Sequence, residues 1–319
     1  MRTSFLAFLT FVGFISCNDD PISDDLEQLQ EAEIQAFIVE NSLDATKDDA
    51  GYYYVVLQDN ELGQSQDNGK ILSIYYSMSI LGGDEISFHQ PENGDPIKLR
   101  QGLGTVVPVG LDLGIALMKE GESYQFILPS ALAFEDLQFS TLIPANSIIS
   151  VEVDLVAVEN EDNIFATEVG LIDSFVVNKN LNDTIANPVD EVQVLSSGLR
   201  YKRQVRGATG VTPQNGDMVE ISYRGTFLNG EQFDATTGND TFEFAFGTRE
   251  VILGLDEAVS LMEVGEQALF LMPSEIAYGP SVRVIPDFLT DQMIERLVIP
   301  DYAGKVTPFE PLAFEITLR

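Results

Sequence analysis

The stretch GDMVEISYRGTFLNGEQFDAT (216–236) decides how the C-terminal third of this 319-residue chain folds. Apolar side chains occupy every second position from 219 to 223, and phenylalanine occupies every second position from 242 to 246. The last segment, 312–318, alternates in the same way. Because neighbouring side chains of a strand point to opposite faces, this period of two predicts an antiparallel sheet with one buried face.

A short helix is expected between these strands. Leu255, Val259 and Met262 are spaced i, i+4 and i+7, which places them on one face of an amphipathic helix. Gly265 follows, and glycine tolerates the positive φ that ends many helices. The helix and the strands must bury their apolar faces against each other. We therefore predict an α+β domain in which one curved antiparallel β-sheet wraps around one short α-helix.

The same order of segments occurs earlier in the chain. LDLGIALMKEGE (111–122) parallels LDEAVSLMEVGE (255–266), and GKILSIYYSM (69–78) parallels GDMVEISYRG (216–225). A fixed order of segments seen twice predicts two copies of one domain. The predicted parts are a signal peptide at 1–16, a lipidated tether with a short helix at 17–50, a first domain at 51–160, a linker with a short helix at 161–207 and a second domain at 208–319.

The N-terminal segment MRTSFLAFLTFVGFISC (1–17) has the pattern of an export signal. Its apolar stretch runs from 5 to 15, which is too short to span a bilayer. FISC (14–17) resembles a bacterial lipobox with Phe where Leu is usual, which predicts cleavage before Cys17 and lipid attachment to its thiol. The alternative is an ordinary signal peptide with an incidental cysteine.

The acidic run NDDPISDDLE (18–27) carries no apolar pattern and predicts a solvated tether between the lipid and the first domain. It resembles the surface-export signals of lipoproteins from the Bacteroidetes group. We therefore expect a protein that is lipid-anchored in the bacterial cell envelope, in the outer membrane, and that faces the periplasm or the cell surface.

Charge and composition exclude several other functions. The chain carries 17 Lys and Arg against 51 Asp and Glu, a net charge of −34, and so acidic a surface repels the phosphates of nucleic acids. With one cysteine and one histidine, His89, the chain offers neither an intramolecular disulfide nor the ligands of a Cys- or His-rich metal centre. We expect no cofactor, no metal and no nucleic-acid partner.

Four segments of the second copy carry a family resemblance. They are 216–236, FEFAFGTREVILGLDEAVSLMEVGE (242–266), MPSEIAYG (272–279) and PLAFEITL (311–318). In their order and spacing they resemble the FKBP family of peptidyl-prolyl cis-trans isomerases, and the first copy shows the same skeleton with fewer signature residues. The resemblance implies two tandem FKBP-like domains, of which the second isomerises X–Pro bonds.

The family's pocket can be carried over to the second copy residue by residue. The resemblance implies aromatic walls, an apolar entrance and floor, a carboxylate beside the reacting amide, and a hydroxyl directed toward the substrate carbonyl. The walls are Tyr223, Phe233, Phe242 and Phe314, the entrance is Val251 and Ile252, the floor is Leu255, the carboxylate is Asp234, the hydroxyl is that of Tyr278, and Val306 is an apolar residue ahead of the last strand. The N–H of Ile252 would hold a substrate carbonyl. Many members have Trp at the floor, so Leu255 implies weak binding of macrolide inhibitors.

A pocket of this kind suits prolyl isomerisation. Amide resonance gives the X–Pro bond a rotation barrier of about 18–20 kcal/mol. Water solvates the planar amide better than the twisted one, so a dry aromatic pocket removes a preference that opposes rotation. Catalysis then requires tighter binding of the twisted state, and it requires neither a nucleophile nor a metal.

The first copy departs from this pattern. Its corresponding positions hold Tyr76, Ile86, Ser87, Leu111, Phe134, Ile143 and Val151. The Phe–Asp pair and the hydroxyl at the Tyr278 position are therefore missing. We predict that the first domain is catalytically weak or inactive and serves as a spacer, a partner-binding surface or a pairing surface.

The second copy departs in one segment. Residues 280–305 separate the AYG string from Val306, and the family's loop at this place is usually shorter. Within this insert, FLTDQMIERL (288–297) predicts a short helix. We expect the insert to overhang the C-terminal pocket, where it either selects substrates or blocks the entrance.

Three classes of function are compatible with these patterns. The first is an isomerase that acts on X–Pro bonds of exported or envelope proteins, with proline-containing polypeptide segments as its partners. The second is a non-catalytic chaperone or peptide-binding lipoprotein. The third is a structural subunit of an envelope assembly. The set Phe233, Asp234 and Tyr278 favours the first class, while the altered first copy is the best argument for the other two.

Overall fold

The computed structural model describes residues 21–319 except 68, 103, 105, 139–141, 183–190, 209, 282, 297–298 and 300–305, and it describes only the backbone of 21–24. The predicted signal peptide and Cys17 lie outside the described residues. The chain forms two compact units. Among the described residues, the N-terminal unit comprises 21–161 together with 280–299, and the C-terminal unit comprises 162–279 together with 306–319, with the gaps given above.

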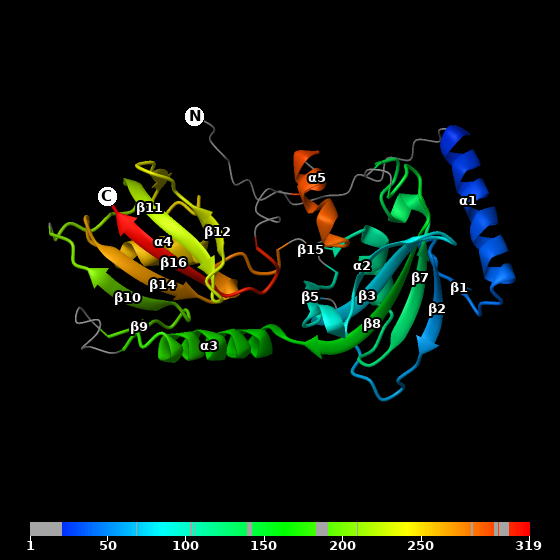
Figure 1. Cartoon of the computed structure of the whole chain (residues 1–319), viewed down its shortest axis with the longest axis horizontal. Helices are drawn as coiled ribbons and strands as arrows, with labels where there is room; N and C mark the ends of the chain where they lie inside the picture. The colour runs from blue at the N-terminus through cyan, green and yellow to red at the C-terminus, as the bar shows by residue number, and fades with distance from the viewer. Residues whose placement is uncertain are drawn as a thin grey trace. The chain divides into compact units, whose positions relative to one another are not determined.

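The described part of the N-terminal unit contains an antiparallel sheet of seven strands (Figure 1). Its strand order is β1 (Thr46–Lys47), β2 (Tyr53–Gln58), β7 (Ser123–Leu128), β8 (Ile149–Glu159), β3 (Ile71–Ile80) and β4 (Glu85–His89), with β5 (Ile97–Arg100) also paired to β3. Helix α2 (Val109–Ile115) packs against the sheet through the buried residues Leu111 and Ile115.

The C-terminal unit repeats this architecture. Within its described residues, seven antiparallel strands form a sheet of the order β12 (Gln232–Ala235), β11 (Met218–Phe227), β16 (Leu312–Leu318), β14 (Gln267–Met272), β10 (Arg200–Val205) and β9 (Gln193–Val194), with β13 (Phe242–Ala245) also paired to β11. Helix α4 (Leu253–Ser260) packs on it through Leu255 and Val259. The predicted α+β fold, two repeated antiparallel sheets with one short helix on each, is confirmed. Short 3-10 helices lie at η1 (Pro91–Asn93), η2 (Ser130–Leu132) and η3 (Ser274–Ile276).

Strand β14 shows that the C-terminal sheet is covered on both faces. Ala268, Phe270 and Met272 belong to the hydrophobic core that contains α4. Leu269 and Leu271, which point the other way, belong to a second cluster with helix α3 (Glu161–Asn178). A fully buried strand of this kind lacks the polar alternation of a one-sided sheet, which is why QALFLM is apolar almost throughout.

Two long helices occupy much of the segments predicted to be a tether and a linker. Helix α1 (Pro21–Glu40) begins inside the run expected to be a solvated tether, and α3 occupies the start of the expected linker at 161–207. Ile34 of α1 and Ile172 of α3, at matching positions of the two repeats, are buried against their sheets. Proline and acidic residues are favourable in the first turn of a helix, so the acidic run continues into α1. Both helices are therefore parts of their domains.

The insert belongs to a different unit than the predicted second domain at 208–319 implies. Its described residues form β15 (Arg283–Val284), the 3-10 helix η4 (Asp287–Leu289) and the predicted short helix, α5 (Thr290–Glu295). These elements belong to the N-terminal unit, where β15 pairs in parallel with β6 (Val106–Val107). The expectation that the insert belongs with the C-terminal domain is therefore wrong, because its apolar residues are buried in the core of the first domain.

In the part of the chain that the structure describes, no helix has both the length and the apolar composition that a membrane span needs.

Candidate active site

A tyrosine and a carboxylate on neighbouring strands form the polar centre of the candidate site. Tyr223 lies on β11 and Asp234 on the edge strand β12, and the antiparallel register pairs Gly225 with Asp234. The Tyr223 hydroxyl donates a 2.7 Å hydrogen bond to Oδ2 of Asp234. Burial raises the pKa of Tyr223 well above its usual range, and the bond to Asp234 raises it further, so the phenol stays protonated and remains a donor.

Aromatic rings surround this pair. Tyr223 and Phe242 meet edge to face with ring centroids 6.1 Å apart and an interplanar angle of 74°. Tyr223 and Phe314 lie at 6.1 Å, and Phe233 and Phe314 meet edge to face at 5.6 Å and 82°. We call these four residues the aromatic cluster. They come from four strands, β11, β12, β13 and β16, which the sheet topology brings together.

The remaining predicted residues pack beside the aromatic cluster. Leu255 on α4 and Val306 are buried in the C-terminal core. Val251, Ile252 and Tyr278 are partly buried and pack against that same core. Ile252 is the N-cap of α4, so its carbonyl accepts the hydrogen bonds of the first helical turn while its own N–H precedes the helix. The structure thus brings all the predicted site residues of the second copy together in one unit.

Two residues that were not singled out from the sequence shape the aromatic cluster. A Cβ at Gly225 would lie 2.6 Å from Cζ of Phe233 and 3.1 Å from Cε1 of Phe314, so only glycine leaves room for both rings. Phe227 packs on Phe233 with ring centroids 5.3 Å apart. The sequence did contain a signal for both residues. Positions 223, 225 and 227 alternate along β11 and therefore lie on the same face of the strand.

Several members of the aromatic cluster are accessible to solvent. Tyr223 and Phe233 are partly buried, and Phe242 is 40% exposed, whereas the neighbouring Phe244 is 2% exposed. Phe244 and Phe246 are core residues, which is typical of phenylalanine at every second position of a strand. The exposed edge of the cluster therefore offers aromatic surface to a ligand, while its inner edge rests on the hydrophobic core. Among the described residues no group of His, Cys, Asp or Glu could hold a metal ion.

The first copy keeps the geometry but changes the chemistry. The Tyr76 hydroxyl lies 3.0 Å from Oγ of Ser87, which takes the place of the Tyr223–Asp234 bond. Tyr76 is 4% exposed and Phe134, at the position of Tyr278, is 4% exposed, so both are core residues.

The backbone donor is missing in the first copy as well. The matched helices place Pro108 where the second copy has Ile252, and proline has no N–H. Leu111, Ile143 and Val151 are fully buried. The described positions of the first copy therefore lack three groups of the second site: the carboxylate of Asp234, the hydroxyl of Tyr278 and the N–H of Ile252.

The antiparallel sheet with its short helix, and the aromatic cluster with its Tyr–Asp pair, are the features that the resemblance to FKBP-type isomerases implied. The sequence agrees with this class over both copies. The chain belongs to the family of FKBP-type peptidyl-prolyl cis-trans isomerases, whose sequence model matches residues 63–156 and 210–319.

Individual relatives match over one domain's length. FK506-binding protein 4 of Dictyostelium discoideum is 39% identical over 94 residues, which is 30% of this chain and 25% of that protein. FKBP-type peptidyl-prolyl cis-trans isomerase FkpA of Aeromonas hydrophila is 40% identical over 89 residues, 28% of this chain and 32% of that protein. Outer membrane protein MIP of Legionella longbeachae is 37% identical over 91 residues, 28% of this chain and 37% of that protein. The match therefore spans well under half the length of each of these relatives.

Proposed function

We propose that the C-terminal unit catalyses cis-trans isomerisation of X–Pro bonds in polypeptides, and that the aromatic cluster and its neighbours form the pocket. The observation that carries this proposal is the convergence of four aromatic rings on the hydrogen-bonded pair Tyr223 and Asp234. The family match at 210–319 covers every residue involved.

The aromatic walls act by excluding water and fitting the twisted proline. In the twisted state the imide nitrogen regains its lone pair, and the bond loses the resonance that holds it planar. Phe233, Phe314 and Phe242 offer ring faces and edges that contact the proline ring without solvating the planar amide. A thousandfold acceleration requires about 4 kcal/mol of tighter binding in the transition state, which is within reach of a few such contacts.

The polar groups orient the substrate. In this proposal the N–H of Ile252 binds a substrate carbonyl, and the hydroxyl of Tyr278 is directed toward the carbonyl of the reacting bond. Asp234 stands beside the reacting amide, and its bond from Tyr223 fixes the direction of the carboxylate. None of these steps forms a covalent bond or transfers a proton to the substrate.

The first domain does not contribute turnover in this proposal. It has Ser87, Phe134 and Pro108 where the second has Asp234, Tyr278 and Ile252. We therefore assign isomerisation to the C-terminal unit alone.

We also propose that the protein works in the bacterial cell envelope, held by a lipid on Cys17, on proline-containing segments of exported proteins. Support comes from the lipobox-like end of 1–17 and from the family likeness to a protein named as an outer membrane protein. Weak macrolide binding is part of the same proposal, because Leu255 replaces the usual floor. Replacing Cys17 by Ser should release the protein from membranes and abolish incorporation of labelled fatty acid.

A protease-coupled assay of prolyl isomerisation on the full chain tests the site. Phe233→Ala removes an aromatic wall and should lower kcat/KM at least about tenfold. Its matched control is Ile86→Ala, which truncates the corresponding side chain of the first copy and should leave kcat/KM unchanged. Equal activity of Phe233→Ala and the wild type would show that the site is assigned wrongly.

A further inference from the structure

The insert of the second copy is a buried part of the first domain. Val284, Ile285, Leu289 and Met293 are at most 2% exposed, and all belong to the hydrophobic core of the N-terminal unit. Pro286, between them, is also buried. In Figure 1, β15 and α5 lie with α2 and the strands of this unit, although their sequence belongs to the second repeat.

The insert enters the first domain as an added strand. β15 pairs in parallel with β6, which sets Arg283 opposite Val106 and Val284 opposite Val107. The N–H of Ile285 then donates a 2.8 Å hydrogen bond to the carbonyl of Val107. Strand addition gives an extended peptide affinity through its main chain, and its side chains give it specificity.

The place of this added strand corresponds to the mouth of the second copy's site. The matched helices align Val107 with Val251, which packs beside the aromatic cluster in the C-terminal unit. The insert thus runs along the backbone that, in the other repeat, is expected to hold a substrate peptide. It does so with a Val-Ile-Pro sequence, an apolar residue followed by proline.

Ile285 and the tyrosine of the first domain, Tyr76, share one hydrophobic core. Arg283 and Asp287, which form a 3.0 Å ion pair, both act electrostatically on the hydroxyl of Tyr76. Burial is the main cause that raises the pKa of Tyr76, and Asp287 raises it further while Arg283 lowers it. Val284 and Ile285, which lie between these two charges, belong to the same buried cluster as Tyr76, which is 4% exposed.

The rest of the first domain's site is apolar and belongs to the same core as the insert. Leu111, Phe134, Ile143 and Val151 are members of the hydrophobic cluster that contains Ile285, and Ile86 packs against it. The far end of the insert is held separately, since Arg296 donates a 2.8 Å hydrogen bond to the carbonyl of Gln138.

We propose that the degenerate site of the first domain is a peptide-binding site, and that its resident ligand is the Val284–Ile285–Pro286 segment of the chain's own second repeat. The ligand class is an extended apolar segment that contains a proline. The site lacks the groups that would turn a substrate over, but it retains the apolar surface and the strand edge that bind one. In the sequence, this segment lies between Tyr278 and Val306 of the second site.

Covalent connection explains why a site of modest affinity is filled. A tethered ligand is present at an effective concentration on the order of millimolar, so a weak intramolecular site remains occupied. A free peptide of the same sequence would have to be present at about that concentration to occupy the site to the same extent.

Hydrogen exchange on the unmodified full chain is the first test. The Ile285 amide should exchange at least about a hundredfold more slowly than an unstructured peptide, because it is buried and donates to Val107. Exchange at the rate of an unstructured peptide would overturn the proposal, and this outcome does not depend on any variant folding.

A matched pair of variants tests the site as a binding site. Leu289 is fully buried and Phe288 is 44% exposed, so Leu289→Asp should expel the insert and Phe288→Asp should not. Proteolysis within the insert should be at least about tenfold faster in Leu289→Asp than in Phe288→Asp.

Binding is then measured with a fluorescent peptide of the sequence 281–299. It should bind the Leu289→Asp chain and not the wild-type or Phe288→Asp chain, and a peptide carrying Ile285→Asp should bind none of them. Failure of the peptide to bind a folded Leu289→Asp chain, or equal binding to the wild type, contradicts the proposal. If Leu289→Asp does not fold, the hydrogen exchange of the wild type decides. These readouts do not use isomerisation, so they are independent of the proposed activity of the second site.

Discussion

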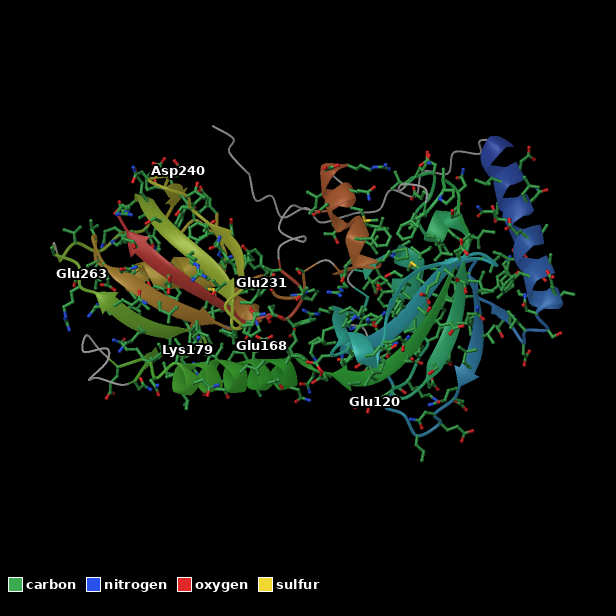
Figure 2. All side chains as sticks on the ribbon, viewed as in Figure 1. Glu120, Glu168, Lys179, Glu231, Asp240 and Glu263 are labelled. Carbon is green, nitrogen blue, oxygen red and sulfur yellow. The ribbon has the colours of Figure 1, made fainter. Side chains whose placement is uncertain are left out.

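Gln30 and Glu168 occupy equivalent positions in the two repeats and hold the two long helices to their domains in the same way. Oε1 of Gln30 accepts a 3.0 Å hydrogen bond from the N–H of Ser130. Glu168, labelled in Figure 2, accepts hydrogen bonds of 2.6 Å from the N–H and 2.7 Å from Oγ of Ser274. One repeat thus uses an amide, and the other uses a carboxyl group that is 3% exposed.

This difference predicts a pH-dependent stability of the C-terminal unit. Burial raises the pKa of Glu168 from 4.5 to about 7, although the two bonds from Ser274 lower it. The folded state therefore binds this proton more tightly than the unfolded chain does, and the free energy of unfolding decreases as the pH rises from 4.5 to about 7. Glu168→Gln should remove this decrease and stabilise the protein at pH 8 by up to about 3 kcal/mol.

Urea denaturation at a series of pH values measures this effect. The wild type and Glu168→Gln should have similar stabilities near pH 4.5 and should diverge as the pH rises through the range of the Glu168 pKa. The reciprocal variant Gln30→Glu should introduce the same dependence into the N-terminal unit. Parallel pH profiles of the wild type and Glu168→Gln would contradict the role of this carboxyl group.

The glycine behind the aromatic cluster predicts a second effect. Gly225→Ala would put a Cβ 2.6 Å from Phe233, so the ring must move. We expect a destabilisation of about 1–3 kcal/mol from overpacking and a loss of isomerisation. The control is Gly170→Ala in α3, where a Cβ has open space and should stabilise the helix by about 0.5–1 kcal/mol. Full activity of Gly225→Ala would show that the position of Phe233 does not matter.

The Tyr223–Asp234 hydrogen bond gives a third prediction. Tyr223→Phe keeps the ring and removes the donor, so the carboxylate loses its fixed direction. We expect kcat/KM to fall by about threefold to tenfold, with a stability change of about 1 kcal/mol. Tyr76→Phe removes the matching hydroxyl of the first copy and should not change kcat/KM. A similar fall in both variants would assign the effect to general destabilisation.

The floor of the site gives a fourth prediction. Leu255 is 7% exposed and smaller than the Trp expected at this place in the family. In line with the weak macrolide binding proposed above, the macrolide FK506 should bind the wild type weakly, and Leu255→Trp should tighten binding by about tenfold through added aromatic contact. Isothermal titration calorimetry measures both affinities. Unchanged or weaker FK506 binding to a folded Leu255→Trp chain would place the ligand elsewhere.

The sequence was sufficient to predict the repeated sheets and the members of the aromatic cluster. Strand periodicity places each of Tyr223, Phe242 and Phe314 on the apolar face of its strand. The consecutive pair Phe233 and Asp234 was identified from the resemblance to the family. Gly225 was missed because its role depends on the register between β11 and its neighbours, which no local pattern contains.

The location of the insert could not be predicted from its own residues. The pattern of 288–297 correctly indicates a short helix, but an apolar helix face fits any complementary surface. The insert pairs with β6 and is buried in the core of the first domain, both of which are formed by residues far earlier in the chain. The lengths of helices α1 and α3, and their packing on the domains, were missed for a similar reason. Acidic composition suggested a tether at 18–27, whereas burial of Gln30 and Ile34 makes α1 part of the domain.

The most direct test of the central claim compares Asp234→Ala with Ser87→Ala in the full chain, using kcat/KM for a prolyl peptide. The two variants remove matching groups from the two repeats. We predict that Asp234→Ala lowers kcat/KM at least about tenfold and that Ser87→Ala leaves it at the wild-type value. Wild-type activity of a folded Asp234→Ala chain, or an equal loss in Ser87→Ala, would contradict a single isomerase site in the C-terminal unit.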